Sequence, residues 1–216
     1  MKEGFLSNLY LKHQPMDGLT VSTPLLRKEG VKITYFSLGK GTDISKETYP
    51  DKTLYFPLGG ELSLDRKDKS LLLRPYDAYL NPEGVLRGTK TKEGTGYIEI
   101  QIGKETETMN CARKAGEVFS LKDLVDYQED SIVNKDLLSN EKRKFVVMAF
   151  DQGQALSAHR APGEAVLFIL EGKGIISYEG KDYEVKEGDE FRFAKNGLHA
   201  VKALTKFKMA LLLALD

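Results

Sequence analysis

The sequence predicts an all-β protein of two tandem antiparallel β-barrels, jelly-roll-like in topology, with one short helix between them. Short runs rich in β-branched and aromatic residues follow one another along the chain and are separated by turns containing Gly, Pro, Asp and Lys. The two halves of the chain repeat each other without a gap. Between the halves, one segment has the apolar spacing typical of a helix.

The repeat has a single constant offset, the one that separates Val21 from Val133. Most of the identical positions are turn glycines, a proline and apolar strand residues, which are positions that build a fold. The identical pairs include Val21 and Val133, Leu25 and Leu137, Leu26 and Leu138, Glu29 and Glu141, Gly41 and Gly153, Ser45 and Ser157, Pro50 and Pro162, Phe56 and Phe168, Leu58 and Leu170, Gly60 and Gly172, Lys69 and Lys181, Asp77 and Asp189, and Leu86 and Leu198. A register held across so many turns indicates a duplicated domain.

The expected boundaries follow from the repeat. Residues 1–18 form an N-terminal arm, 19–104 the first barrel, 105–130 a linker with the short helix, and 131–216 the second barrel. Strands are expected to begin near Val21 and Val133. In the linker, Ser120 is the expected N-cap of a helix over 121–128, because Leu121, Leu124 and Val125 fall on one helical face.

Charge and composition exclude several classes of protein. Lys plus Arg and Asp plus Glu both number 32, and the two kinds are interspersed, so no broad basic face for nucleic acid is expected. The one cysteine, Cys111, has no partner for an intramolecular disulfide. The longest apolar run, 209–215, is shorter than the roughly 20 residues that span a bilayer. With no recognisable secretion signal, we expect a cytoplasmic protein without membrane contact.

Two of the three histidines, His159 and His199, lie in the second half. Each follows a glycine-marked turn, and a hydrophobic run ending at Gly172 and a Gly188-Asp pair separate them. This arrangement resembles the two motifs of the cupin superfamily, whose barrel is also called a double-stranded β-helix. The stretch that is similar to small bacterial cupins covers about 117–216, and with the repeat it implies a two-barrel cupin, or bicupin.

The resemblance implies a metal site in the second barrel. In cupins the first motif supplies two histidines spaced one apart and a glutamate, and the second motif supplies a third histidine. His159 and His199 match the first and last of these, and Glu164 is the remaining candidate ligand for a divalent ion such as Zn, Ni, Mn or Fe. The second histidine position is Ala161 and the glutamate position is Ala165.

Glu164 stands one residue early, which on a strand turns a side chain to the opposite face. It is a ligand only if Pro162 and Gly163 form a bulge that redirects it. The alternative for the two histidines is a hydrogen-bonded pair inside the barrel without a metal.

The first copy differs at the polar positions. Glu47 stands at the position of His159, Lys52 at that of Glu164 and Arg87 at that of His199. We therefore expect a first barrel that lost its histidine site. Arg87 is hypothesised to reach Glu47 across the barrel, with two solvated turns as the alternative, and Lys52 to extend outward.

Two functions remain open from the sequence. The favoured one is a bicupin that binds a small polar molecule in the second barrel, with a divalent metal as an option. The alternative is a metal-dependent enzyme of the isomerase, decarboxylase or oxygenase type, and the sequence does not decide whether the protein is catalytic. The expected partner is a small-molecule ligand or substrate, and the chain is expected to be a monomer or a homodimer.

Overall fold

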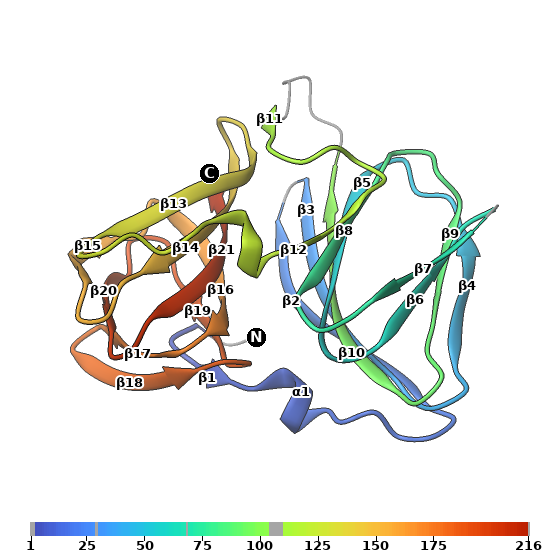
Figure 1. Cartoon of the computed structure of the whole chain (residues 1–216), viewed down its shortest axis with the longest axis horizontal. Helices are drawn as coiled ribbons and strands as arrows, with labels where there is room; N and C mark the ends of the chain where they lie inside the picture. The colour runs from blue at the N-terminus through green and yellow to red at the C-terminus, as the bar shows by residue number, and fades with distance from the viewer. Residues whose placement is uncertain (1–2, 29, 68, 104–109, 216) are drawn as a thin grey trace. The chain divides into compact units, whose positions relative to one another are not determined.

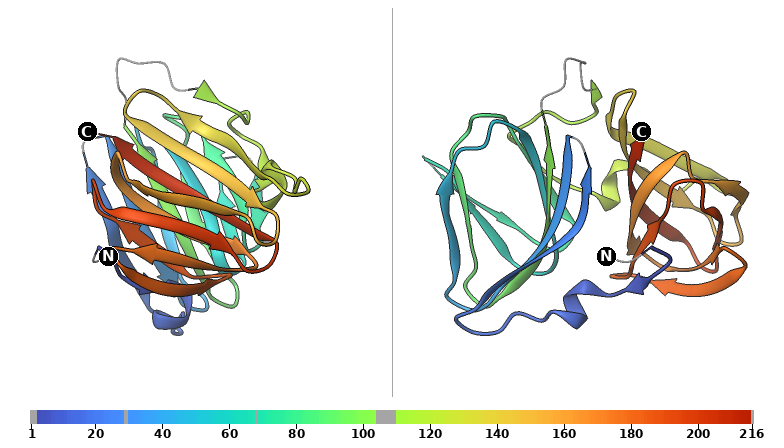
Figure 2. Two further views of the ribbon diagram at one scale, coloured as in Figure 1. Left: turned by 90° about the vertical axis from the view of Figure 1, so that its left-hand side faces the viewer. Right: turned by 180° about the vertical axis from the view of Figure 1, so that it is seen from behind.

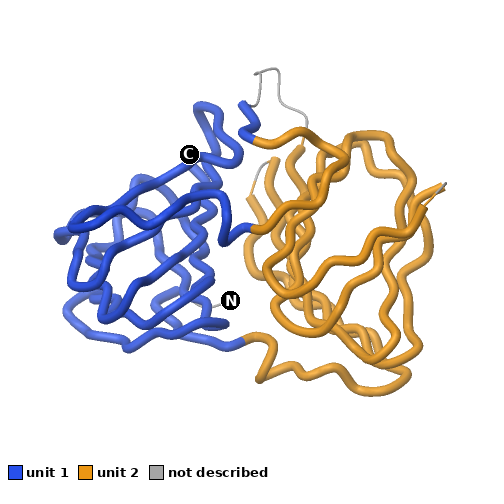
Figure 3. Tube along the Cα trace, viewed as in Figure 1, with its two compact units in different colours: residues 1–8, 107–112, 121–216 blue, residues 9–106, 113–120 orange. Residues whose placement is uncertain are grey.

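The computed structural model describes residues 3–28, 30–67, 69–103 and 110–215. The chain forms two compact units (Figures 1 and 3). One unit, here called the first barrel, comprises residues 9–106 and 113–120. The other, the second barrel, comprises residues 1–8, 107–112 and 121–216. The expected linker of residues 105–130 falls partly outside the described residues, and its remainder is shared between the two units.

The first barrel contains a six-stranded and a four-stranded antiparallel sheet. The larger sheet has the strand order β12-β8-β5-β10-β3-β2, and the smaller one β4-β9-β6-β7. The bounds are β2 Thr20–Lys28, β3 Val31–Leu38, β4 Asp43–Glu47, β5 Lys52–Gly60, β6 Leu62–Asp65, β7 Ser70–Leu73, β8 Asp77–Asn81, β9 Arg87–Lys90, β10 Thr95–Ile102 and β12 Val118–Ser120.

The second barrel contains a seven-stranded and a four-stranded antiparallel sheet. Their orders are β1-β19-β16-β21-β14-β13-β11 and β15-β20-β17-β18. The bounds are β1 Leu6–Ser7, β11 Asn110–Cys111, β13 Ile132–Ser139, β14 Arg143–Phe150, β15 Ala155–Arg160, β16 Gly163–Glu171, β17 Lys173–Tyr178, β18 Lys181–Lys186, β19 Glu190–Phe193, β20 Leu198–Ala203 and β21 Phe207–Leu215. In each unit the strands wrap around a common interior (Figure 2). The predicted pair of antiparallel barrels is confirmed.

The two barrels have equivalent turns as well as equivalent strands. Gly60 and Gly172 both have a positive φ, of 72° and 81°, a region that favours glycine. A Cβ added at Gly60 would lie 2.2 Å from the carbonyl oxygen of Gly94, and one added at Gly172 would lie 2.0 Å from that of Lys206. Gly94 and Lys206 are themselves equivalent positions of the repeat. The predicted repeat therefore extends to the close approach of two backbone segments in each copy.

Alternate residues of the strands fill the interior of each barrel, because successive side chains of a strand point to opposite faces. The core of the second barrel includes Ala165, Leu167, Phe191 and Phe193. The interior of the first barrel is richer in tyrosine; one cluster of its buried residues consists of Leu38, Tyr55, Leu62, Leu64, Leu73, Tyr79 and Tyr97. The first interior therefore has more hydroxyl groups to satisfy than the second.

The prediction of a helix over 121–128 is wrong in its length and in its first residue. The structure has a single 3₁₀ turn, η1, at Lys122–Leu124, whose N-cap is Leu121 rather than Ser120. Val125 is already extended, with φ −141° and ψ 133°. Leu121, Leu124 and Val125 are all buried, as the apolar spacing predicted. One 3₁₀ turn followed by extended chain is enough to bury these three side chains, so their burial does not require a longer helix.

The N-terminal arm is divided between the two units. Strand β1 pairs with β19 of the second barrel, where Leu6 lies opposite Phe191 and packs against the core. The four-residue helix α1, Leu9–Lys12, belongs to the first barrel. The described residues include no helix with the length and apolar character needed to cross a membrane.

Candidate functional site

The two histidines of the second barrel lie side by side at neighbouring strands. His159 on β15 and His199 on β20 are directly opposite each other in the strand pairing. Their ring centroids are 4.2 Å apart, with an angle of 52° between the ring planes. His199 is 8% exposed, whereas His159 is exposed. The pair therefore converges, but at the edge of the barrel rather than wholly inside it, because β15 is the outermost strand of its sheet.

The hydrogen bonds of both rings fix their tautomers. Nδ1 of His159 lies 2.9 Å from the carbonyl oxygen of Ser157, and Nδ1 of His199 lies 3.1 Å from that of Gly197. A carbonyl oxygen only accepts, so each Nδ1 carries the proton and donates it. Each Nε2 of the neutral rings then presents a lone pair. Metal-bound histidines commonly have this backbone contact, which orients the ring.

The surroundings of His199 keep its ring neutral. Its ring centroid lies 4.3 Å from that of Phe193, a core residue. Burial is the main cause that lowers the pKa of His199 from its ordinary value of 6.5, and nearby His159 acts in the same direction. The hydrogen bond to Gly197 opposes this shift. A buried neutral imidazole is a suitable ligand for a divalent cation.

Glu164 does not join the histidines. No bulge redirects it: Gly163, Glu164 and Ala165 pair in regular register with β21, and the shift in this pairing occurs between Ile169 and Glu171. Ala165 lies in the core, so Glu164 faces the other side of the sheet. There its carboxylate accepts a hydrogen bond and forms an ion pair with Arg192. The expectation that Glu164 is the third ligand is therefore not met in this structure.

The two imidazoles are the candidate metal ligands that the described residues provide at this place. Ala161, at the position of the missing histidine, is 1% exposed and belongs to the core. Over the described ranges, no group of three or more His, Cys, Asp or Glu is placed so that it could hold a metal ion. Catalytic zinc sites use three protein ligands. The pair could therefore supply two donor atoms to a divalent ion, and the remaining positions would be left to water or to a bound molecule.

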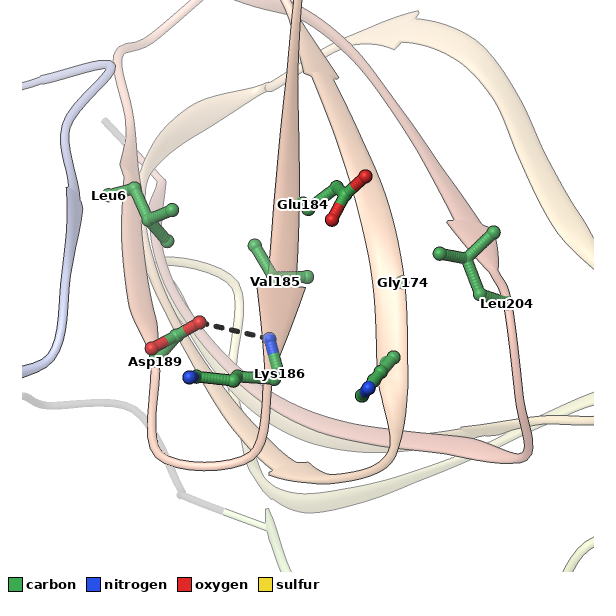
Figure 4. A pocket seen from close by; sticks show the side chains of 8 residues that line it. Leu6, Gly174, Glu184, Val185, Lys186, Asp189 and Leu204 are labelled. Carbon is green, nitrogen blue, oxygen red and sulfur yellow. Dashed lines mark hydrogen bonds between the residues drawn. The ribbon is translucent and has the colours of Figure 1, made fainter.

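A pocket of about 360 Å³ lies elsewhere in the second barrel, away from the histidines (Figure 4). Its lining combines apolar and charged side chains, with the carboxylate of Asp189 accepting a hydrogen bond from the backbone of Lys186. Gly174, in its wall, pairs with Ala203, whereas His199 pairs with Tyr178 at the other end of the same two strands. Its lining residues are Leu6, Lys173, Gly174, Glu184, Val185, Lys186, Asp189 and Leu204.

In the first barrel, Glu47 and Arg87 are opposite each other on β4 and β9, as His159 and His199 are in the second. The hypothesised ion pair between them is nevertheless wrong. Arg87 is 3% exposed and donates to the hydroxyl oxygens of Tyr55 and Thr53. Glu47 is exposed and accepts a hydrogen bond from Tyr49 at 2.6 Å. The charges do not meet, because the guanidinium of Arg87 is buried and the carboxylate of Glu47 is exposed.

Two residues of this cluster were missed from the sequence. Tyr49 and Thr53 are the repeat equivalents of Ala161 and Ala165, the positions of the second histidine and the glutamate in the cupin motif. The repeat offset therefore carried the signal that could have found them. Lys52, whose side chain was expected to extend outward, is half-buried at the start of β5.

Comparison with known proteins identifies the second barrel. The Cupin_2 family model, described as a cupin domain, matches residues 146–215. An oxalate-binding protein from Thermotoga maritima is 29% identical over 100 residues, which cover 45% of this chain and 75% of that protein.

Solved structures resemble the whole chain. A cupin 2 conserved barrel domain protein from Leptotrichia buccalis has a TM-score of 0.88 at 24% identity and covers 99% of this chain and 98% of its own. A salicylate 1,2-dioxygenase from Pseudaminobacter salicylatoxidans has a TM-score of 0.66 at 12% identity, over 89% of this chain and 76% of its own. These likenesses concern the fold. The chain therefore has the fold of a two-barrel cupin, and within it residues 146–215 match the cupin domain family.

Proposed function

We propose that the second barrel binds a small polar molecule at His159 and His199, together with one divalent metal ion held by the two Nε2 atoms. The observation that carries this proposal is the pair of Nδ1 contacts to backbone carbonyls, which leaves both Nε2 lone pairs available beside each other. Within the described residues, neither Nε2 has a hydrogen-bond partner.

The bound molecule is proposed to be a small carboxylate such as oxalate. Two neutral imidazoles repel a carboxylate if both present lone pairs to it, so an intervening cation is required at neutral pH. A dicarboxylate supplies two oxygen donors, which complete a coordination shell that two histidines leave open. The similarity of 100 residues of this chain to an oxalate-binding protein supports this choice.

Binding is favoured over catalysis because of the ligand set. A metal ion bound at this pair would supply Lewis acidity to the carboxylate, while the chain's own residues bind and orient it. The carboxylate of Glu164 is engaged by Arg192 on the other face of the sheet, so it is not available as a general base at the histidines. This arrangement supports a binding protein more than an isomerase, decarboxylase or oxygenase.

Calorimetric titration of untagged, chelator-treated protein tests the proposal. Zn²⁺, Ni²⁺, Mn²⁺ and Fe²⁺ are added separately, with and without oxalate. We expect one ion to bind per chain and to bind more tightly when oxalate is present. His159→Ala and His199→Ala should abolish this binding, and His13→Ala, which changes the one histidine outside the second barrel, should leave it intact.

The proposal fails if none of the four ions binds. It also fails if His199→Ala binds metal and oxalate as the unaltered protein does, because the ions would then be held elsewhere.

A further inference from the structure

The pocket at one end of the second barrel is a candidate site separate from the two histidines. Its volume of about 360 Å³ lies within the range of about 300–1,000 Å³ that is typical of small-molecule sites. Strand ends gather around it, since Lys173 is the first residue of β17, Lys186 is the last of β18, and Leu204 directly follows β20. Leu6 of β1 completes the wall (Figure 4). The pocket therefore has room for a small molecule.

Two lysines of the pocket lie directly opposite each other. Lys173 on β17 pairs with Lys186 on β18, and both side chains are exposed. Directly opposite residues point to the same face of a sheet, and like charges in such a pair are unfavourable. Within the described ranges, neither ammonium group has a carboxylate at ion-pair distance. A ligand carboxylate between the two lysines would reduce their repulsion.

The lining of the pocket also includes two carboxylates, which differ in their contacts. Asp189 is 8% exposed and accepts hydrogen bonds from the side chain of Asn8 at 3.2 Å and from the backbone of Lys186 at 2.9 Å. Glu184 is exposed, and its carboxylate makes no hydrogen bond or ion pair with the part of the chain that the structure describes. It precedes Lys186 by two residues, so both side chains point to the same face of β18. Glu184 is therefore the carboxylate available to a ligand cation.

Apolar side chains form the rest of the lining. Val185 is buried in the core of the barrel, Leu6 packs against this core, and Leu204 is 38% exposed. The two ammonium groups and the two carboxylates of the lining have no net charge at neutral pH. A complementary ligand therefore has one positive and one negative charge next to an apolar group.

We propose that this pocket binds an α-amino acid with an apolar side chain. The carboxylate of the amino acid lies between Lys173 and Lys186, its ammonium group contacts Glu184, and its side chain packs against the apolar wall. Both charges are attached to one carbon atom, so a single small molecule contacts lysine and glutamate together. Because the charged side chains of the protein are exposed, each contact is weak and the bound molecule exchanges rapidly. The site needs neither a metal ion nor a histidine, so it is independent of the function proposed above.

Titration of the ¹⁵N-labelled chain with L-leucine, followed by ¹H–¹⁵N NMR in the presence of a chelator, tests this site. We expect the amide signals of Gly174 and Val185 to shift progressively, and those of the first barrel to stay unchanged. Two analogues separate the charges, since 4-methylpentanoate lacks the ammonium group and 3-methylbutylamine lacks the carboxylate. Each analogue should bind about threefold or more weakly than leucine, because one charged contact is lost.

Variants of the pocket test the assigned contacts. Lys173→Met and Glu184→Gln should each weaken leucine binding by about threefold or more. Both side chains are exposed, so neither change alters the core. Lys181→Met is the matched control, because it changes an exposed lysine at the other end of β18, and it should bind leucine as the unaltered protein does.

The proposal is overturned if leucine does not shift the signals of Gly174 and Val185. It is also overturned if 4-methylpentanoate binds as tightly as leucine, because the pocket would then not recognise the ammonium group. Unchanged leucine binding in both Lys173→Met and Glu184→Gln would overturn it as well.

Discussion

Replacing Gly172 with alanine, compared with the same change at Gly153, tests the close turn that both barrels share. The two glycines have similar positive φ values, 81° and 84°. A Cβ at Gly153 would meet nothing within 4 Å. A Cβ at Gly172 would lie 2.0 Å from the carbonyl oxygen of Lys206, so backbone would have to move. Gly153→Ala is therefore a matched control for the backbone conformation alone.

The expected magnitudes follow from these contacts. A left-handed conformation costs a non-glycine residue about 1–2 kcal/mol, and alanine recovers part of this by restricting the unfolded chain. Gly153→Ala should therefore lower the free energy of unfolding by about 1 kcal/mol. Overpacking adds about 1–3 kcal/mol. Gly172→Ala should then lower it by about 2–4 kcal/mol.

Urea denaturation at fixed pH measures both values. The chain contains no tryptophan, so far-UV circular dichroism and tyrosine fluorescence are the appropriate probes. Gly60→Ala in the first barrel should behave like Gly172→Ala, since its Cβ would lie 2.2 Å from the carbonyl oxygen of Gly94. If Gly172→Ala is no more destabilising than Gly153→Ala, the close approach deduced from the turn is refuted.

Two further predictions concern the second barrel. Because burial lowers the pKa of His199, the unfolded chain takes up a proton at a higher pH than the folded protein does, so stability should fall as pH drops below 6.5 toward the folded-state pKa. Urea titrations of chelator-treated protein between about pH 8 and 5 should show this slope, His199→Asn should reduce it and His13→Asn should not. Separately, Glu164→Ala should lower the unfolding free energy by about 1.5–3 kcal/mol, since it removes a hydrogen-bonded carboxylate partner of Arg192, while metal affinity stays unchanged. A loss of metal affinity in folded Glu164→Ala would instead make Glu164 a ligand.

The fold was predictable because both halves of the chain give the same pattern of strands and turns. Apolar strand residues and turn glycines of one half had counterparts at a constant offset in the other, and the strands β3 and β14 begin at equivalent positions, Val31 and Arg143. The helix was not predictable in length. The apolar spacing of Leu121, Leu124 and Val125 is compatible with a helix, but one 3₁₀ turn followed by extended chain buries the same three side chains.

Parts of the site depend on tertiary contacts that spacing does not contain. The sequence predicted that His159 and His199 lie close together. It did not predict the exposure of His159, which results from the edge position of β15. The face of Glu164 was decided by the absence of a bulge, since its pairing with β21 is regular. For Arg87, opposite charge suggested an ion pair with Glu47, whereas its hydrogen-bond partners are the hydroxyls of Tyr55 and Thr53.

Long-range ¹H–¹⁵N NMR of the histidine side chains tests the central claim most directly. The chain has three histidines, so mutation of each assigns the spectrum. At a pH where the rings are neutral, we expect His159 and His199 to be protonated at Nδ1, and Zn²⁺ with oxalate to shift both Nε2 signals while His13 does not change. Protonation of either ring at Nε2, or unchanged Nε2 signals after the addition of Zn²⁺ and oxalate, would contradict the account.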